Sequence, residues 1–141
     1  MSAQMLELPE TESCEVAVER PVLIVEDDES IAEVLSIRLN RQGFQTFVAH
    51  NGHQGLREAR RHRPRLILLD IRLPDIDGFQ ICQQIDEDPA TCGTPVIILS
   101  GMERPDIIRR SRAVGCTYFV RKPYDPNALL VLIDAAMRET D

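Results

Sequence analysis

The sequence lacks several features that mark common protein classes. It has no tryptophan, and none of its four cysteines stands in a C-x-x-C spacing typical of zinc or redox motifs. No apolar run approaches the ~20 residues that span a bilayer, and the N-terminus has neither the basic start nor the apolar core of a secretion signal. We therefore expect a cytoplasmic protein with free thiols and no membrane contact.

Positive charge is also scarce. The formal net charge is -7, which argues against a surface that binds nucleic acid directly. The acidic excess is concentrated in residues 1–19, which contain glutamates but no lysine or arginine, whereas residues 20–141 are almost balanced. We interpret residues 1–19 as a flexible acidic extension and residues 20–141 as one domain.

Lysine and arginine together occur sixteen times, and Lys122, in the segment "FVRKPY", is the only lysine among them. A lone lysine at a strand end is usually solvated. Retaining lysine where arginine is otherwise used nevertheless suggests a position that needs a compact point charge. Pro123, which follows it, could hold a cis peptide bond that aims the lysine inward.

Short apolar runs rich in β-branched residues alternate with amphipathic segments of helical length. The runs predict buried strands over residues 22–26, 44–49, 65–70, 95–100 and 117–121. The apolar faces of the five predicted helices contain, in order, Ile31, Val34, Leu35 and Leu39; Leu56 and Ala59; Phe79, Ile81, Cys82 and Ile85; Ile107, Ile108, Ala113 and Val114; and Leu129, Leu132, Ile133 and Met137. The alternation predicts an α/β fold in which helices cover both faces of a parallel sheet.

The limits of the first helix have local signals. Ser30 followed by Glu33 predicts a capping box at its start, and Gly43 is predicted to end it. Asp28 is assigned to the entry of this helix, because acidic side chains are favourable near a helix N-terminus.

Acidic side chains follow two of the predicted strands. Glu26 and Asp27 come after the first strand, and Asp70 ends the third. In an open parallel sheet, ligands bind beyond the carboxyl ends of the strands. Two carboxylates about 4 Å apart repel by roughly 4 kcal/mol, so this cluster needs a cation. A set of oxygen ligands without histidine or cysteine favours Mg²⁺.

Ser100, followed by Gly101, ends the fourth strand, and Lys122 ends the fifth. Each of these motifs is weak alone, but their order and spacing are specific: Ser100 lies thirty residues after Asp70, and Lys122 lies twenty-two residues after Ser100. With "LLDIRLPDIDG", "ILSG" and "FVRKPY", residues 20–140 resemble the receiver domain of bacterial two-component response regulators. The resemblance implies a flavodoxin-like, doubly wound (βα)5 fold with strand order 2-1-3-4-5.

The resemblance also implies the chemistry of the site. Asp70 is expected to accept a phosphoryl group from a phosphohistidine on a sensor histidine kinase or a histidine phosphotransfer protein. Asp27, Asp70 and the backbone carbonyl of Arg72 are expected to bind Mg²⁺, with Glu26 acting through water. Lys122 and Ser100 are expected to contact phosphoryl oxygens.

The same resemblance implies a conformational switch in which Ser100 and Phe119 move together. Phe119 lacks the hydroxyl of the tyrosine that is commoner at this position, and Tyr118 is expected on the opposite face of the sheet. The switch surface comprises the fourth helix, the fifth strand and the fifth helix. It would act on an unidentified downstream protein or form a homodimer. Arg72 and Met102 occupy positions that flank the route of water to the phosphoryl group.

On this interpretation the chain is a signalling switch, not an enzyme that turns over other substrates, and it carries no output domain. Three alternatives remain open from sequence alone. A phosphatase of the haloacid-dehalogenase type is disfavoured because Arg72 stands where that family needs a second acid. A flavin-binding flavodoxin is disfavoured because "EDDES" would repel the cofactor phosphate. A receiver-like protein that only binds partners is disfavoured because every expected site residue is present.

Overall fold

The computed structural model describes residues 21–101, 109–110, 113 and 117–139. Its strands are β2 (Pro21–Val25), β3 (Gln45–Ala49), β4 (Leu66–Asp70), β5 (Val96–Ser100) and β6 (Tyr118–Arg121). Its helices are α2 (Glu29–Arg41), α3 (Gly52–His62), α4 (Gly78–Glu87) and α6 (Pro126–Glu139). The predicted acidic extension and most of the predicted fourth helix lie outside the described residues.

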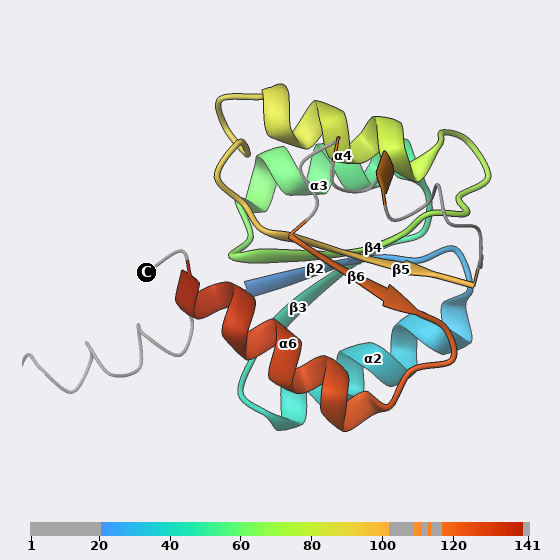
Figure 1. Ribbon diagram of the computed structural model, residues 1–141, viewed down its shortest axis with the longest axis vertical. Coiled ribbons are helices and arrows are strands. Elements are labelled where there is room, and N and C mark those ends of the chain that lie inside the picture. Colours follow the sequence, from blue (N-terminus) through green and yellow to red (C-terminus); the bar gives the residue numbers. More distant parts are fainter. Residues whose placement is uncertain (1–20, 102–108, 111–112, 114–116, 140–141) are drawn as a thin grey trace, which may run out of the picture.

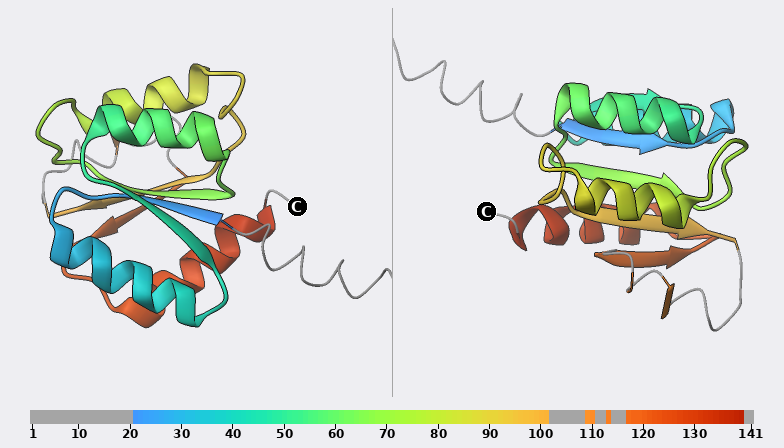
Figure 2. Two further views of the ribbon diagram at one scale, coloured as in Figure 1. Left: turned by 180° about the vertical axis from the view of Figure 1, so that it is seen from behind. Right: turned by 90° about the horizontal axis from the view of Figure 1, so that it is seen from above.

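The strands form one parallel sheet in the order β3-β2-β4-β5-β6. Counted along the chain, this is the predicted order 2-1-3-4-5, and the flavodoxin-like doubly wound fold is confirmed. Each strand begins and ends within one residue of its predicted limits. Helices α3 and α4 cover one face of the sheet, and α2 and α6 cover the other (Figures 1 and 2).

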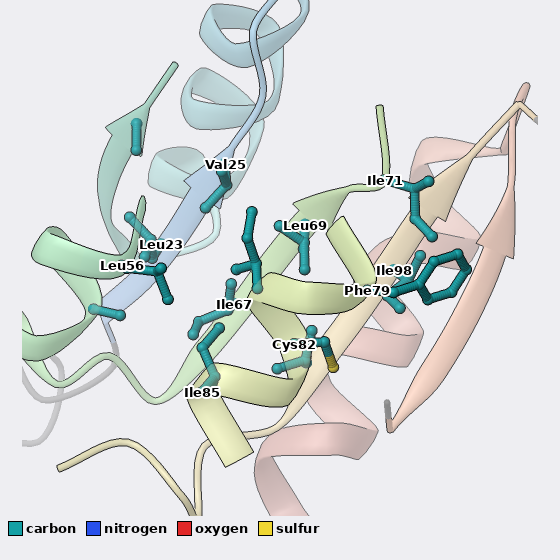
Figure 3. Packing of buried hydrophobic residues seen from close by; sticks show 14 residues of the cluster. Leu23, Val25, Leu56, Ile67, Leu69, Ile71, Phe79, Cys82, Ile85 and Ile98 are labelled. Atoms are coloured by element: carbon teal, nitrogen blue, oxygen red, sulfur yellow. The ribbon is translucent and has the colours of Figure 1, made fainter. Parts of the chain in front are cut away.

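The sheet separates two apolar cores. The α3/α4-side core contains residues such as Leu69, Phe79 and Ile98, and Figure 3 shows them packed between the sheet and the two helices. The α2/α6-side core contains Leu68 and Ile133, among others. Leu68 and Leu69 are neighbours in one strand but face opposite cores, because successive strand side chains alternate. Fully buried strands explain why the apolar runs in the sequence are continuous.

The N-terminus of α2 differs from its prediction. Asp28 is the N-cap, and its carboxylate accepts hydrogen bonds from the amides of Ser30 and Ile31. The predicted capping box on Ser30 is therefore wrong. Asp28 and Ser30 both favour N-cap positions, and the turn after β2 is short enough that the earlier of the two meets the helix. The assignment of Asp28 to the helix entry is confirmed.

The apolar face of α2 is also rotated from its predicted position. Its buried residues are Ala32, Leu35 and Leu39, whereas Ile31 is 38% and Val34 56% exposed. The prediction that Ile31 and Val34 face the core is wrong. Two adjacent apolar stripes run along this helix, and the stripe of Ala32, Leu35 and Leu39 is the one that packs into the α2/α6-side core.

At its C-terminus, α2 ends as predicted at Gly43. The amide of Gly43 donates to the carbonyl of Asn40 and the amide of Phe44 to that of Leu39, both at 3.0 Å. This pair of hydrogen bonds defines a Schellman motif, which needs a left-handed residue after the helix. Gly43 has a φ of 93°.

Replacing Gly43 by alanine is expected to lower the free energy of unfolding by about 1 kcal/mol, because a Cβ disfavours this backbone conformation. Gly93→Ala is the matched control. Both glycines have open space where a Cβ would lie, but Gly93 has no positive φ. Urea denaturation of both variants tests the difference, and equal losses of stability would contradict the role assigned to the backbone of Gly43.

Two cysteines fall within the described residues. Cys82 is buried in α4, Cys92 is exposed, and neither forms a disulfide. Cys14 and Cys116 lie outside these residues. In the part of the chain that the structure describes, no helix is long and apolar enough to cross a membrane.

Candidate functional site

The register of the parallel strands brings the predicted acidic residues to one edge of the sheet. Val25 pairs with Leu69, so Glu26 and Asp70, the next residues along the two strands, lie level with each other. The carboxylate oxygens of Glu26, Asp27 and Asp70 lie within 4.8 Å of one another. Glu26 is 2% and Asp70 6% exposed, whereas Asp27 is exposed. The predicted convergence of these three side chains is therefore present in the structure.

Lys122 reaches the same cluster from the end of β6. Its Nζ lies 3.2 Å from Oε1 of Glu26 and 3.4 Å from Oδ2 of Asp70. The peptide bond between Lys122 and Pro123 is cis, the geometry that the sequence suggested. Burial lowers the pKa of Lys122, but the carboxylates of Asp70 and Glu26 raise it above its usual value. The ammonium group therefore stays charged between the two acids.

One lysine does not balance the negative charge of the cluster. Burial, which is the largest cause, and repulsion from Asp70 together raise the pKa of Glu26 from 4.5 to about 7. The amide of Asp28, which donates to Oε2 of Glu26 at 3.2 Å, and the charge of Lys122 oppose it only in part. The raised pKa of Glu26 shows that Lys122 and the amide of Asp28 offset the cost of a charged carboxylate here only in part.

The donor set fits a hard divalent cation. All three groups offer carboxylate oxygens, which Mg²⁺ prefers, and they converge on one point from two strand ends. Such an ion would offset the repulsion that raises the pKa of Glu26. The acidic cluster therefore fits the magnesium site expected from the sequence.

The loop after β4 carries Arg72, the remaining predicted ligand. The amide of Arg72 donates to Oδ1 of Asp70 at 3.0 Å, which fixes the first turn of the loop against the acidic cluster. At the other end of the loop, a Cβ on Gly78 would lie 2.6 Å from the Cα of Ile71. Gly78 is thus required by the close approach of the two ends of this loop.

The residues of the predicted switch lie on the neighbouring strands. Ser100 ends β5 and is 1% exposed. Phe119 on β6 packs against the α3/α4-side core, and Tyr118 packs against the α2/α6-side core. The prediction that these two aromatic side chains lie on opposite faces is confirmed. Met102 lies outside the described residues.

Two further residues adjoin the site, and the sequence analysis assigned neither of them. Nδ1 of His50, just after β3, lies 3.1 Å from the backbone oxygen of Glu26. The carboxylate of Asp75, in the loop of Arg72, accepts hydrogen bonds from the amides of Gly52 and His53 in α3. The parallel register could have indicated His50 as a neighbour of Glu26. No local pattern connects Asp75 with residues more than twenty positions earlier.

Comparisons with known proteins identify the family of the chain. The family model described as the response regulator receiver domain matches residues 22–134. The DNA-binding response regulator MtrA of Mycobacterium tuberculosis is 33% identical over 120 residues, which are 85% of this chain and 51% of MtrA. The DNA-binding dual master transcriptional regulator RpaA of Synechocystis is 32% identical over 120 residues, 85% of this chain and 50% of RpaA. The chain thus spans about half the length of these two relatives.

Solved structures show the same fold. A CheY-like receiver domain protein of Methanospirillum hungatei superposes with a TM-score of 0.81 and 26% identity, over 86% of this chain and 95% of that protein. The chemotaxis protein CheY4 of Vibrio cholerae superposes with a TM-score of 0.79 and 27% identity, over 84% of this chain and 99% of that protein. From the match to the family model, the strand order and these superpositions, we conclude that the chain belongs to the response regulator receiver domain family of two-component systems.

Proposed function

We propose that this receiver domain accepts a phosphoryl group on Asp70. A carboxylate oxygen of Asp70 attacks phosphorus, the bond between phosphorus and the donor imidazole nitrogen breaks, and that nitrogen keeps the electron pair. The donor is a phosphohistidine on a sensor histidine kinase or a histidine phosphotransfer protein. The domain acts on itself and turns over no other substrate.

The observation that carries this proposal is the position of Asp70 within the acidic cluster and beside the only lysine of the chain. Its Oδ2 lies 3.4 Å from Nζ of Lys122, and its Oδ1 is held by the amide of Arg72. A phosphoryl group on Asp70 brings negative charge close to the ammonium group of Lys122. Lys122 thereby stabilises charge on the transferred group, and a fixed point charge of this kind needs little reorganisation.

Mg²⁺ belongs to the proposal. Asp27, Asp70 and the backbone carbonyl of Arg72 would hold the ion, with Glu26 acting indirectly through water. When bound, the ion supplies charge neutralisation for the carboxylates and for the phosphoryl oxygens. Glu26 and Lys122 set the charge of the site around it, because a carboxylate oxygen of Glu26 and the ammonium group of Lys122 both lie close to Asp70.

The switch follows from the residues beside Asp70. Ser100 donates a hydrogen bond to a phosphoryl oxygen once Asp70 is modified, and Phe119 changes its packing with it. Because Phe119 has no hydroxyl, its coupling to Ser100 rests on packing alone. The change shifts the population of conformations of the surface made by the predicted fourth helix, β6 and α6. This surface then binds a downstream protein or a second copy of the chain.

Intact mass spectrometry after incubation with Mg²⁺ and a small phosphodonor tests the proposal. We expect one phosphoryl adduct on the wild type and none on Asp70→Asn. Asp88→Asn, a remote exchange of the same kind, should keep the adduct. The absence of an adduct on the wild type, or its survival in Asp70→Asn, would overturn the proposal. Steady release of phosphate from a phosphate ester would instead favour a phosphatase.

A further inference from the structure

The carboxylate of Asp75 closes the N-terminus of α3 from outside that helix. Its Oδ1 accepts a hydrogen bond from the amide of Gly52 at 2.7 Å, and its Oδ2 accepts one from the amide of His53 at 2.9 Å. The N-cap, Asn51, reaches only the amide of Gln54. The first turn of α3 has no acidic residue of its own. Asp75 therefore supplies the negative charge that a helix N-terminus favours.

Tight side-chain packing on Gly52 accompanies these hydrogen bonds. A Cβ on Gly52 would lie 1.9 Å from Cγ2 of Ile76 and 2.7 Å from Cδ1 of Ile81. Any residue larger than glycine at this position would clash with Ile76, in the loop formed by residues 71–77, and with Ile81 of α4, so these neighbours would have to move. The middle of the loop is thus held against α3 by the hydrogen bonds of Asp75 and by the packing of Ile76 on Gly52.

The amides also keep Asp75 ionised. Partial burial raises the pKa of Asp75, but the hydrogen bonds from His53 and Gly52 together bring it below its ordinary value of 3.8. The ring of His53 adds to this, with Nε2 at 3.8 Å from Oδ2 of Asp75. At neutral pH the tie between loop and helix is therefore a charge-assisted one, which is stronger than a neutral hydrogen bond.

We propose that Asp75 is a positioning residue for metal binding. By holding residues 71–77 against α3, it fixes the path of the chain three residues after Arg72, and so the position of the Arg72 carbonyl. This inference rests on the proposed function, which assigns that carbonyl as a metal ligand. Without the tie, the loop samples several positions, and binding of Mg²⁺ must first select one of them. Affinity for the ion falls, while phosphoryl acceptance at saturating Mg²⁺ is retained.

Calorimetric titration of the full chain with Mg²⁺ tests the proposal. Asp75→Asn keeps one oxygen acceptor but loses the charge and the second acceptor. We expect it to raise the dissociation constant for Mg²⁺ about tenfold, the lower end of the effect of removing groups that orient metal ligands. The initial rate of adduct formation at saturating Mg²⁺ should be unchanged. Unfolding temperature measured without Mg²⁺ separates this effect from a loss of stability.

Asp88→Asn is the matched control. Asp88 also accepts a backbone amide, that of Ala90 at 2.9 Å, and it also joins α4 to α3, through Arg60 at 2.6 Å. It does so at the opposite end of these helices, so its replacement should leave the dissociation constant unchanged.

Gly52→Ala provides a second and independent test, because its Cβ crowds Ile76 of the loop without changing any charge. It should weaken Mg²⁺ binding as Asp75→Asn does. Equal dissociation constants in the wild type and both variants would overturn the positioning role and leave the proposed function intact. A lower unfolding temperature with unchanged Mg²⁺ affinity would overturn it as well. Failure of the wild type to bind Mg²⁺ would instead overturn the proposed metal site itself, and this inference with it.

Discussion

Raising the pH from about 5 to about 8 in the presence of a chelator is expected to destabilise the protein, with Glu26 contributing about 3 kcal/mol. Burial and repulsion from Asp70 raise the pKa of Glu26 from 4.5 to about 7. The folded protein therefore binds this proton more tightly than the unfolded chain. The stabilisation is fully present below about pH 4.5 and is lost as the pH rises through about 7.

Urea denaturation at a series of pH values, with and without Mg²⁺, measures this effect. At the upper end of the range, Glu26→Gln should be more stable than the wild type in chelator and should lose most of the pH dependence. Added Mg²⁺ should restore stability to the wild type by binding the folded state. Glu33→Gln, an exposed glutamate of α2, is the control and should follow the wild type. Parallel pH profiles of the wild type and Glu26→Gln would show that Glu26 does not carry the effect.

Lys122→Arg is expected to keep the fold and the charge but to uncouple phosphorylation from the switch. The ammonium group of Lys122 lies between Oε1 of Glu26 and Oδ2 of Asp70, at 3.2 and 3.4 Å. A guanidinium group is planar and longer, so it cannot place the same point charge in that position. Binding at one site typically changes the equilibrium constant at a coupled site by about 5- to 150-fold. In Lys122→Arg, the factor by which phosphorylation changes the switch equilibrium should fall to near one.

Amide chemical shifts of β6 and α6, recorded with and without beryllofluoride and Mg²⁺, provide the measurement. Intact mass should show that Lys122→Arg still forms an adduct on Asp70, although the switch does not respond. Arg121→Lys, the converse exchange at the exposed neighbouring position, should respond as the wild type does. If Lys122→Arg shows the wild-type shifts, a compact point charge is not the reason that this position keeps a lysine.

Much of the fold could be predicted because its sheet is buried on both faces. Runs such as "LILLD" and "VIILS" have no polar interruption, so their limits were predicted to within one residue. The strand order came from the family resemblance, not from these patterns. The convergence of Glu26 and Asp70 then followed from the parallel register, because Glu26 directly follows β2 and Asp70 ends the neighbouring strand β4.

Features that depend on which of two similar residues makes a given tertiary contact could not be predicted. Ser30 and Asp28 are both good N-caps, and the sequence does not state how short the preceding turn is. The apolar stripes of α2 are nearly equivalent until the helix packs on the sheet. The ring of Phe79 lies under the guanidinium of Arg110 at 4.1 Å, and no local spacing in the sequence connects these two residues. Each of these outcomes depends on how the elements pack in three dimensions, and the spacing of residues along the sequence does not determine that packing.

Because the sheet divides the interior into two cores, two aromatic side chains can serve as separate spectroscopic probes of the two cores. Tyr118 and Phe119 are consecutive in β6, yet their rings lie in different cores, one against α2 and α6 and the other against α3 and α4. The chain has only six aromatic rings of these two kinds and no tryptophan, so their signals can be resolved without labels. An event at Asp70 that reaches one half of the molecule before the other would appear first in one ring and later in its neighbour.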